Sequence, residues 1–145
     1  MDTLLENPAF KLYALCSAII ALQLVALALW TGTVRVLRKQ WVNPEDARLN
    51  KGENTEVDHP DVQRTKRAHQ NLLENAVPFF VVGLLYVLSG AHRSGAQAYF
   101  FTFVGARLAH TVFYLWGKQP FRTICFGIGV LAIIGMGVQV IGVVT

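Results

Sequence analysis

The chain has 145 residues, of which 53% are hydrophobic and only 15% are charged, and its mean hydropathy is +0.40. A soluble domain usually has about 25% charged residues, so this composition indicates a membrane protein, and the length allows one domain over residues 1–145. The net charge of +4 does not indicate nucleic-acid binding, because acidic residues are mixed with the basic ones and no basic stripe forms.

The first predicted element is a long helix over about residues 8–39. Asn7 and Pro8 are typical of a helix N-terminus. The stretch from Leu12 to Trp30 has no charged residue and is long enough to cross about 30 Å of hydrocarbon. It is longer than the apolar part of a signal peptide, and no small-residue cleavage site follows, so we expect this helix to be retained.

A loop is predicted next, over about residues 40–60, because turn-forming pairs such as Asn43-Pro44 interrupt it. Three further helices are expected, over about residues 61–88, 95–116 and 120–143. The uninterrupted apolar part of the first of these is too short to cross a bilayer alone, so part of its polar beginning must lie at membrane depth. The prediction is an all-α, integral-membrane, multi-pass protein with a bundle of four helices.

Four spans place both termini on one side of the membrane and the 40–60 loop on the other. Most of the 13 basic residues lie at or near the loop side, which assigns that side to the cytoplasm and the termini to the opposite side. The charge bias fits the endoplasmic reticulum of a eukaryote and the inner membrane of a bacterium equally well.

The two cysteines, Cys16 and Cys125, lie in apolar stretches and are expected to be small buried side chains. The sequence contains no metal-ligand spacing and no disulfide framework, so we predict neither a metal site nor a disulfide.

Two of the predicted helices carry polar and ionisable side chains along one face. These residues are Arg67, Asn71 and Glu74 on helix 61–88, and Arg107, His110 and Tyr114 on helix 95–116. A charge at membrane depth costs about 2.5–3.5 kcal/mol on insertion scales, so such residues usually face the protein interior and mark a site. Glu74 and Arg107 lie at similar depth, and we expect them to form a structural ion pair.

Three arginines, Arg35, Arg67 and Arg122, fall near the cytoplasmic ends of three helices. One interpretation is that they extend to lipid headgroups. Their grouping with polar residues one or two turns deeper favours an anion pocket open to the cytoplasm, because the planar guanidinium can bind both oxygens of a carboxylate. No hydrolase arrangement is visible, but an arginine at the mouth could stabilise a thiolate that a ligand brings in.

The order of several motifs resembles the MAPEG superfamily, the membrane-associated proteins of eicosanoid and glutathione metabolism. The motifs are Asn43-Pro44-Glu45-Asp46, the segment 67–71 with Glu74-Asn75 and Pro78-Phe79, and the segment 104–107 with His110-Thr111 and Tyr114. The resemblance covers about residues 25–125. Residues 51–54 and 84–90 are similar to the microsomal glutathione transferase branch, whereas residues 31–35 and 109–111 are similar to the prostaglandin E synthase branch.

The resemblance implies a homotrimer of four-helix subunits that binds glutathione between neighbouring subunits near the cytoplasmic side. It implies that Arg122 holds the thiolate, with Thr123 in place of a serine near the thiol and Asp46 as an assisting aspartate. The positions that match glutathione contacts are Arg35, Arg67, Asn71, Glu74, His110, Tyr114 and Phe126. Two departures are Phe126, which replaces a tyrosine, and Gln70, which replaces an arginine of the synthases.

The implied activity is that of a glutathione transferase that directs the thiolate at lipophilic electrophiles, with a peroxidase activity on lipid hydroperoxides. One alternative is a glutathione-dependent isomerase of the prostaglandin E synthase type, which leaves glutathione unconsumed. A second is a non-catalytic lipid-binding membrane protein, and a third is a structural bundle with buried ion pairs. The expected partners are glutathione, a lipophilic substrate, the bilayer and further copies of the chain.

Overall fold

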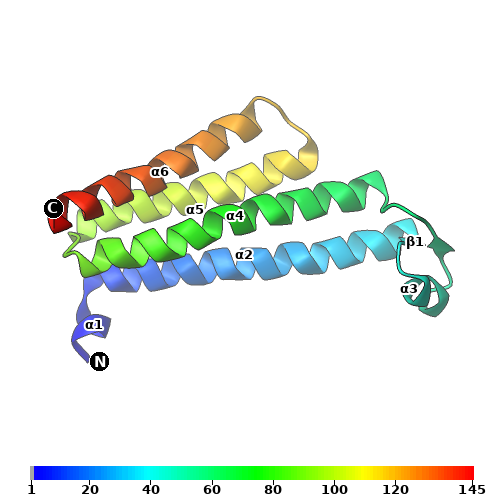
Figure 1. Ribbon diagram of the computed structural model, residues 1–145, viewed down its shortest axis with the longest axis horizontal. Helices are drawn as coiled ribbons and strands as arrows, with labels where there is room; N and C mark the ends of the chain where they lie inside the picture. The colour runs from blue at the N-terminus through cyan, green and yellow to red at the C-terminus, as the bar shows by residue number, and fades with distance from the viewer. Residues whose placement is uncertain (1) are drawn as a thin grey trace.

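Four long helices lie side by side in the computed structural model, which describes residues 2–145 and their side chains from residue 4 onward (Figure 1). They are α2 (Pro8–Arg38), α4 (Pro60–Leu88), α5 (Arg93–Trp116) and α6 (Phe121–Val144), and the short α1 (Asp2–Glu6) precedes them. Three of them, α2, α4 and α6, are long and apolar enough to cross a membrane. The protein is therefore almost entirely helical, and three of the four predicted spans have the length and composition of membrane-crossing helices.

The helices begin and end where local backbone chemistry favours it. The Asn7 side chain accepts hydrogen bonds from the backbone N–H of Ala9, at 2.8 Å, and of Phe10, at 3.3 Å, and Pro8 occupies the first turn of α2. These contacts confirm the predicted N-cap. Gly117 ends α5 at φ 69°, in the left-handed region that glycine enters without steric cost.

The segment between α2 and α4 has more structure than the expected loop. The strand β1 (Gln40–Trp41) pairs in parallel with β2 (Glu53–Asn54), and the helix α3 (Pro44–Leu49) lies between them in sequence. Trp41 is buried against Gly52, where a Cβ atom would collide with the indole ring. Breaker residues show where the chain turns but not which segments pair, so the sequence predicted the turns and missed this small cap at the end of α2 (Figure 1).

An aromatic cluster fills the half of the helices nearer the chain termini, which lie at the same end of the molecule (Figure 1). The rings of Phe79 on α4 and Phe103 on α5 stack at 4.2 Å between centroids, and Phe100 meets Phe79 edge-on at 5.8 Å. All three rings are fully buried. Tyr13 of α2 closes the cluster and donates its hydroxyl hydrogen to the carbonyl of Phe80 at 2.9 Å. The polar residues lie in the other half, toward the β1–α3–β2 cap.

Candidate functional site

A hollow of about 250 Å³ lies between α4, α5 and α6 in the polar half of the protein. Its six lining residues come from three helices, and all six are among the predicted site residues. They are Asn71 of α4, His110 and Tyr114 of α5, and Arg122, Thr123 and Phe126 of α6. None of these side chains carries a negative charge, and one carries a positive charge, so the hollow is suited to an anion.

Arg122 lies in the first turn of α6, and the Tyr114 ring holds it in place. The guanidinium carbon is 4.6 Å from the centre of that ring, which is close enough for a cation–π contact. Thr123 follows it and donates its hydroxyl hydrogen to the side-chain oxygen of Gln119 at 3.0 Å. The aromatic face fixes the direction of the guanidinium while leaving its N–H groups available to a ligand.

Asn71 and His110 form the inner wall of the hollow. His110 is 4% exposed, and its ring lies 5.6 Å from that of Tyr114 and 6.2 Å from that of Phe126. The side-chain oxygen Oδ1 of Asn71 is buried and has no hydrogen-bond partner. A buried amide oxygen without a partner is costly, so the Asn71 side chain is ready to accept a hydrogen bond from a bound molecule.

Arg107 is fully buried, one helical turn before His110 in α5 and closer to the aromatic cluster. It donates through Nη2 to the carbonyl of Phe126 at 2.8 Å, and its guanidinium lies 5.5 Å from the ring of Phe103 and 5.3 Å from the ring of Phe126. Its Nε and Nη1 atoms have no partner. Gly129 of α6 makes room for this side chain, because a Cβ atom there would collide with the guanidinium.

The predicted ion pair between Glu74 and Arg107 is not formed within the chain. Glu74 lies on the exposed face of α4 and accepts a hydrogen bond from Gln70 at 3.0 Å, whereas Arg107 points into the interior toward α6. Similar depth along two helices does not place two side chains on facing sides, and here the rotation of α4 separates them.

Arg67 is exposed on the same outer face of α4, where it donates to the side-chain oxygen of Gln63 at 3.3 Å. Arg67 and Glu74 therefore flank Asn71 along the helix but lie outside the hollow. A face of a membrane helix that carries an arginine and a glutamate is costly to expose to lipid, so it needs a cover other than hydrocarbon.

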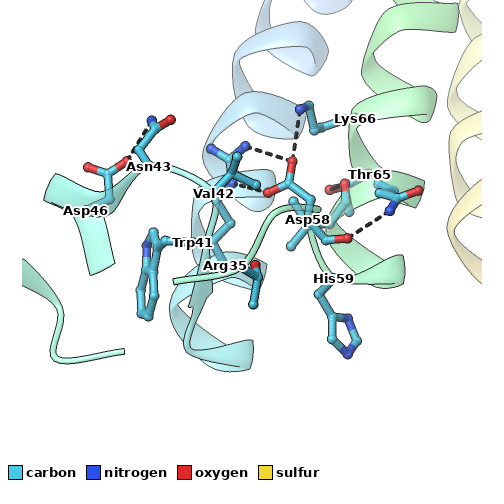
Figure 2. Close-up of polar contacts among 12 residues, drawn as sticks. Arg35, Trp41, Val42, Asn43, Asp46, Asp58, His59, Thr65 and Lys66 are labelled. Atoms are coloured by element: carbon cyan, nitrogen blue, oxygen red, sulfur yellow. Dashed lines mark hydrogen bonds and ion pairs between the residues drawn. The ribbon is translucent and has the colours of Figure 1, made fainter. Parts of the chain in front are cut away.

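Arg35 lies in the last turn of α2, a helix that contributes no residue to the lining of the hollow. It binds Asp58 with two hydrogen bonds, from Nε at 3.2 Å and from Nη2 at 3.3 Å, and Lys66 binds the same carboxylate at 3.0 Å (Figure 2). Burial by itself raises the pKa of the Asp58 carboxyl, but the hydrogen bonds and charges of Arg35 and Lys66 outweigh it and hold the pKa below its ordinary value.

Sequence reasoning missed Asp58 as the partner of Arg35. The available signal was an acidic residue just before the start of α4, opposite an arginine at the end of α2. Asp46 is placed apart from this cluster, in α3, where it accepts a hydrogen bond from Asn43 at 3.1 Å (Figure 2). Within one chain, Asp46, Arg35, Arg67 and Glu74 do not reach the hollow that the other six site residues share.

Known proteins resemble this chain over most of its length. The sequence model of the MAPEG family matches residues 13–142. The chain is 34% identical to prostaglandin E synthase of Homo sapiens over 139 residues, which are 94% of this chain and 91% of that protein. It is 40% identical to microsomal glutathione S-transferase 1 of Sus scrofa over 134 residues, covering 89% and 86% of the two chains. This chain therefore belongs to the MAPEG family.

Proposed function

We propose that this protein is a homotrimeric membrane glutathione transferase that uses the glutathione thiolate against lipophilic electrophiles and lipid hydroperoxides. The observation that carries the proposal is the hollow in which Asn71, His110, Tyr114 and Arg122 converge. Relatives named glutathione S-transferase and prostaglandin E synthase cover most of the chain and support an enzyme of this class.

The residues of the hollow fit glutathione, a tripeptide with two carboxylates and a thiol. Arg122 offers a positive charge, and Asn71 offers an acceptor that now lacks a donor. The volume of about 250 Å³ lies just below the roughly 300–1,000 Å³ of common small-molecule sites, so one chain would enclose only part of the tripeptide.

Glutathione supplies the thiol nucleophile. Arg122 would hold the sulfur as a thiolate, because a neighbouring positive charge lowers the pKa of a thiol. The Thr123 hydroxyl would become a second donor by turning its hydrogen from Gln119 to the sulfur, and the buried Arg107 adds positive potential from the interior side. Phe126 and Tyr114 would cover the sulfur from water, which strengthens the attraction between guanidinium and thiolate.

A second subunit would complete the site. The outer face of α4 with Arg67 and Glu74 needs a polar cover, and a neighbouring copy of α2 and the β1–α3–β2 cap would bring Arg35 and Asp46 to it. Heterologous contacts of this kind close into a ring, and a trimer of four-helix, four-span subunits is the arrangement we propose. The cap would face the cytoplasm and the termini the opposite side, in the endoplasmic reticulum or a bacterial inner membrane.

The runner-up function is a glutathione-dependent isomerase, which the 34% identity to prostaglandin E synthase favours. An isomerase returns glutathione unchanged, whereas a transferase consumes it. Product analysis with an aryl halide, a lipid hydroperoxide and a cyclic lipid peroxide therefore separates the two. A non-catalytic lipid-binding protein would bind none of the glutathione.

Calorimetric titration of glutathione into the purified, detergent-solubilised protein tests the proposal directly. We expect saturable binding that is weakened at least about tenfold in Arg122→Gln, the loss expected for a charge-assisted contact. Arg93→Gln is the matched control, since Arg93 is exposed at the far end of α5. Absence of binding at millimolar glutathione would overturn the proposal that this protein is a glutathione-dependent enzyme.

Mixing variants tests the shared site. Arg35→Ala and Arg122→Ala homomers should each bind glutathione weakly. Equal co-expression should recover about a quarter of all sites, which is one site in each mixed trimer, if each site takes Arg35 from one subunit and Arg122 from the next. No recovery in mixed oligomers of confirmed composition would show that the two arginines do not meet across an interface.

A further inference from the structure

Two hollows meet along the outer side of α2 and α5, away from the glutathione site. The larger, of about 630 Å³, lies at the cap end of the helices between α2, α4 and α5. The second, of about 470 Å³, lies deeper along α2 and α5. Trp30 and Leu115 line both, so they form one continuous groove, here called the α2–α5 groove. From Gln23 to Arg38 it follows α2 for about 22 Å.

The cap end of this groove is polar and positively charged. Arg38 pairs with Asp61 across it, so these two charges balance. Arg64 carries the remaining charge: one guanidinium nitrogen donates to the carbonyl of Leu115 at 3.4 Å, and among the side chains of residues 4–145 no carboxylate lies within 4 Å of it. The groove therefore presents one uncompensated arginine at the end where α2 finishes.

The deeper end is apolar. Its walls include Ala26 and Leu27 of α2 and Leu108 and Val112 of α5. Trp30, 48% exposed, and Trp116, 68% exposed, line the groove near its polar end. Tryptophan is enriched at the level of lipid headgroups, so these two rings mark the depth at which the groove passes from headgroups to acyl chains.

The groove and the glutathione site lie on different sides of α5. His110 and Tyr114 face the hollow with Arg122, whereas Leu108, Val112 and Leu115 face the groove. On a helix of 3.6 residues per turn these two sets are on roughly opposite faces. An occupant of the groove would therefore not occupy the place of glutathione.

We propose that the α2–α5 groove binds one anionic phospholipid of the cap-side leaflet, with its phosphate at Arg64 and an acyl chain along Ala26 and Val112. The charge argues for this occupant: one unpaired arginine above an apolar channel complements a single negative headgroup above a hydrocarbon chain. A second protein helix would fill the apolar part but would leave Arg64 without a counter-charge. The proposal depends on insertion into a membrane and not on the glutathione chemistry.

Native mass spectrometry of the delipidated full-length protein in detergent tests the proposal, with phosphatidylglycerol and phosphatidylcholine of identical acyl chains as probes. We expect phosphatidylglycerol to bind about fivefold more tightly, the factor expected for one arginine beside an anionic headgroup. Arg64→Gln should remove this preference, and Arg93→Gln should keep it. Ala26→Trp should fill the channel and reduce the retention of both lipids, whereas Ala28→Trp, exposed on α2 but outside the groove, should not.

Equal retention of the two lipids by the unmodified protein would overturn the proposal. So would a preference that survives Arg64→Gln, or retention unaffected by Ala26→Trp. Displacement of phosphatidylglycerol by an equal concentration of inorganic phosphate would also overturn it, because that result assigns a plain anion site. Glutathione binding measured on the same Arg64→Gln protein should stay unchanged, which separates this test from that of the proposed function.

Discussion

The two halves of the helices bury their side chains in different ways. Toward the termini, Phe79, Phe100 and Phe103 are fully buried, and they interlock without a charged group among them. Toward the cap, the buried side chains include Arg107 and His110, and three buried polar atoms of Asn71 and Arg107 have no partner. The half nearer the termini has one such atom, Oγ of Ser17, whereas the half nearer the cap has more bonding capacity left for a ligand or a neighbour.

Arg107 lies at the boundary between these halves. Its guanidinium packs on the ring of Phe103 from the aromatic half and on that of Phe126 from the polar half. The aromatic half thus provides a rigid base. The polar half holds buried polar atoms of Asn71 and Arg107 that find no hydrogen-bond partner within the chain. Rigid supports beneath unsatisfied groups are typical of binding sites.

The largest expected effect comes from opening the aromatic half. Phe79→Ala removes a fully buried ring that stacks on Phe103, and we expect a loss of about 3 kcal/mol in the free energy of unfolding. Unfolding of the purified protein in mixed micelles with increasing dodecyl sulfate measures it. Val81→Ala, at a side chain 55% exposed, should change little, and equal losses in both variants would contradict the tight packing.

Next in size is the effect of Arg122 on turnover. Arg122→Gln should lower kcat/KM for glutathione conjugation about 100-fold, the usual loss when a charge-stabilising donor is removed, without changing the unfolding midpoint. Steady-state kinetics with an aryl halide measure the rate, with Arg93→Gln as the control. A rate at the level of the unmodified protein would exclude Arg122 from the role of holding the thiolate.

The boundary can be tested with two glycines of the same helix. Gly129→Ala places a methyl group against the buried Arg107 guanidinium and should cost about 2 kcal/mol, because the guanidinium has rings on both sides. Gly127→Ala meets nothing within 4 Å and should be neutral or slightly stabilising through helix propensity. Thermal unfolding in detergent compares them, and identical midpoints would show that Arg107 is free to move.

The smallest effect concerns the cluster at the end of α2. The pKa of Asp58 is lowered by Arg35 and Lys66, so this carboxylate contributes stability above its ordinary pKa of about 3.9 and loses it as the pH falls through the lower folded value. Asp58→Asn should therefore cost about 1 kcal/mol at pH 7, since both cationic partners are partly exposed.

At pH 3 the cost of Asp58→Asn should be smaller than at pH 7, because pH 3 lies below the ordinary carboxyl pKa, so the unfolded chain is largely protonated there and keeping Asp58 ionised in the folded protein contributes less stability. Unfolding measured in the same detergent at the two pH values checks this direction. A cost that stays constant or grows toward pH 3 would contradict the paired, ionised Asp58.

Helical periodicity predicted the polar stripes of α4 and α5, but it could not say how much of each stripe is covered. Arg67, Asn71 and Glu74 share one face of α4, and only Asn71 reaches the hollow, because α5 and α6 cover just the inner edge of that face. The Glu74–Arg107 pair was expected from depth alone and is absent from the single chain for the same reason. Thr123 and Phe126 were assigned by resemblance to the family, and Arg122 also by its position near the cytoplasmic end of a helix; the structure brings all three to the hollow.

The sequence by itself determined the membrane-spanning apolar helices, the cap at Asn7, the termination at Gly117 and membership of the MAPEG family. These properties depend on composition, on local backbone chemistry and on residue identity at matching positions. Only the tertiary structure decided which polar side chains meet: the hollow at Arg122, the buried Arg107 between two rings, and Asp58 between Arg35 and Lys66. The physical reason is that a helix period fixes the direction of a side chain relative to its own axis, whereas contact depends on how each helix is rotated against its neighbours.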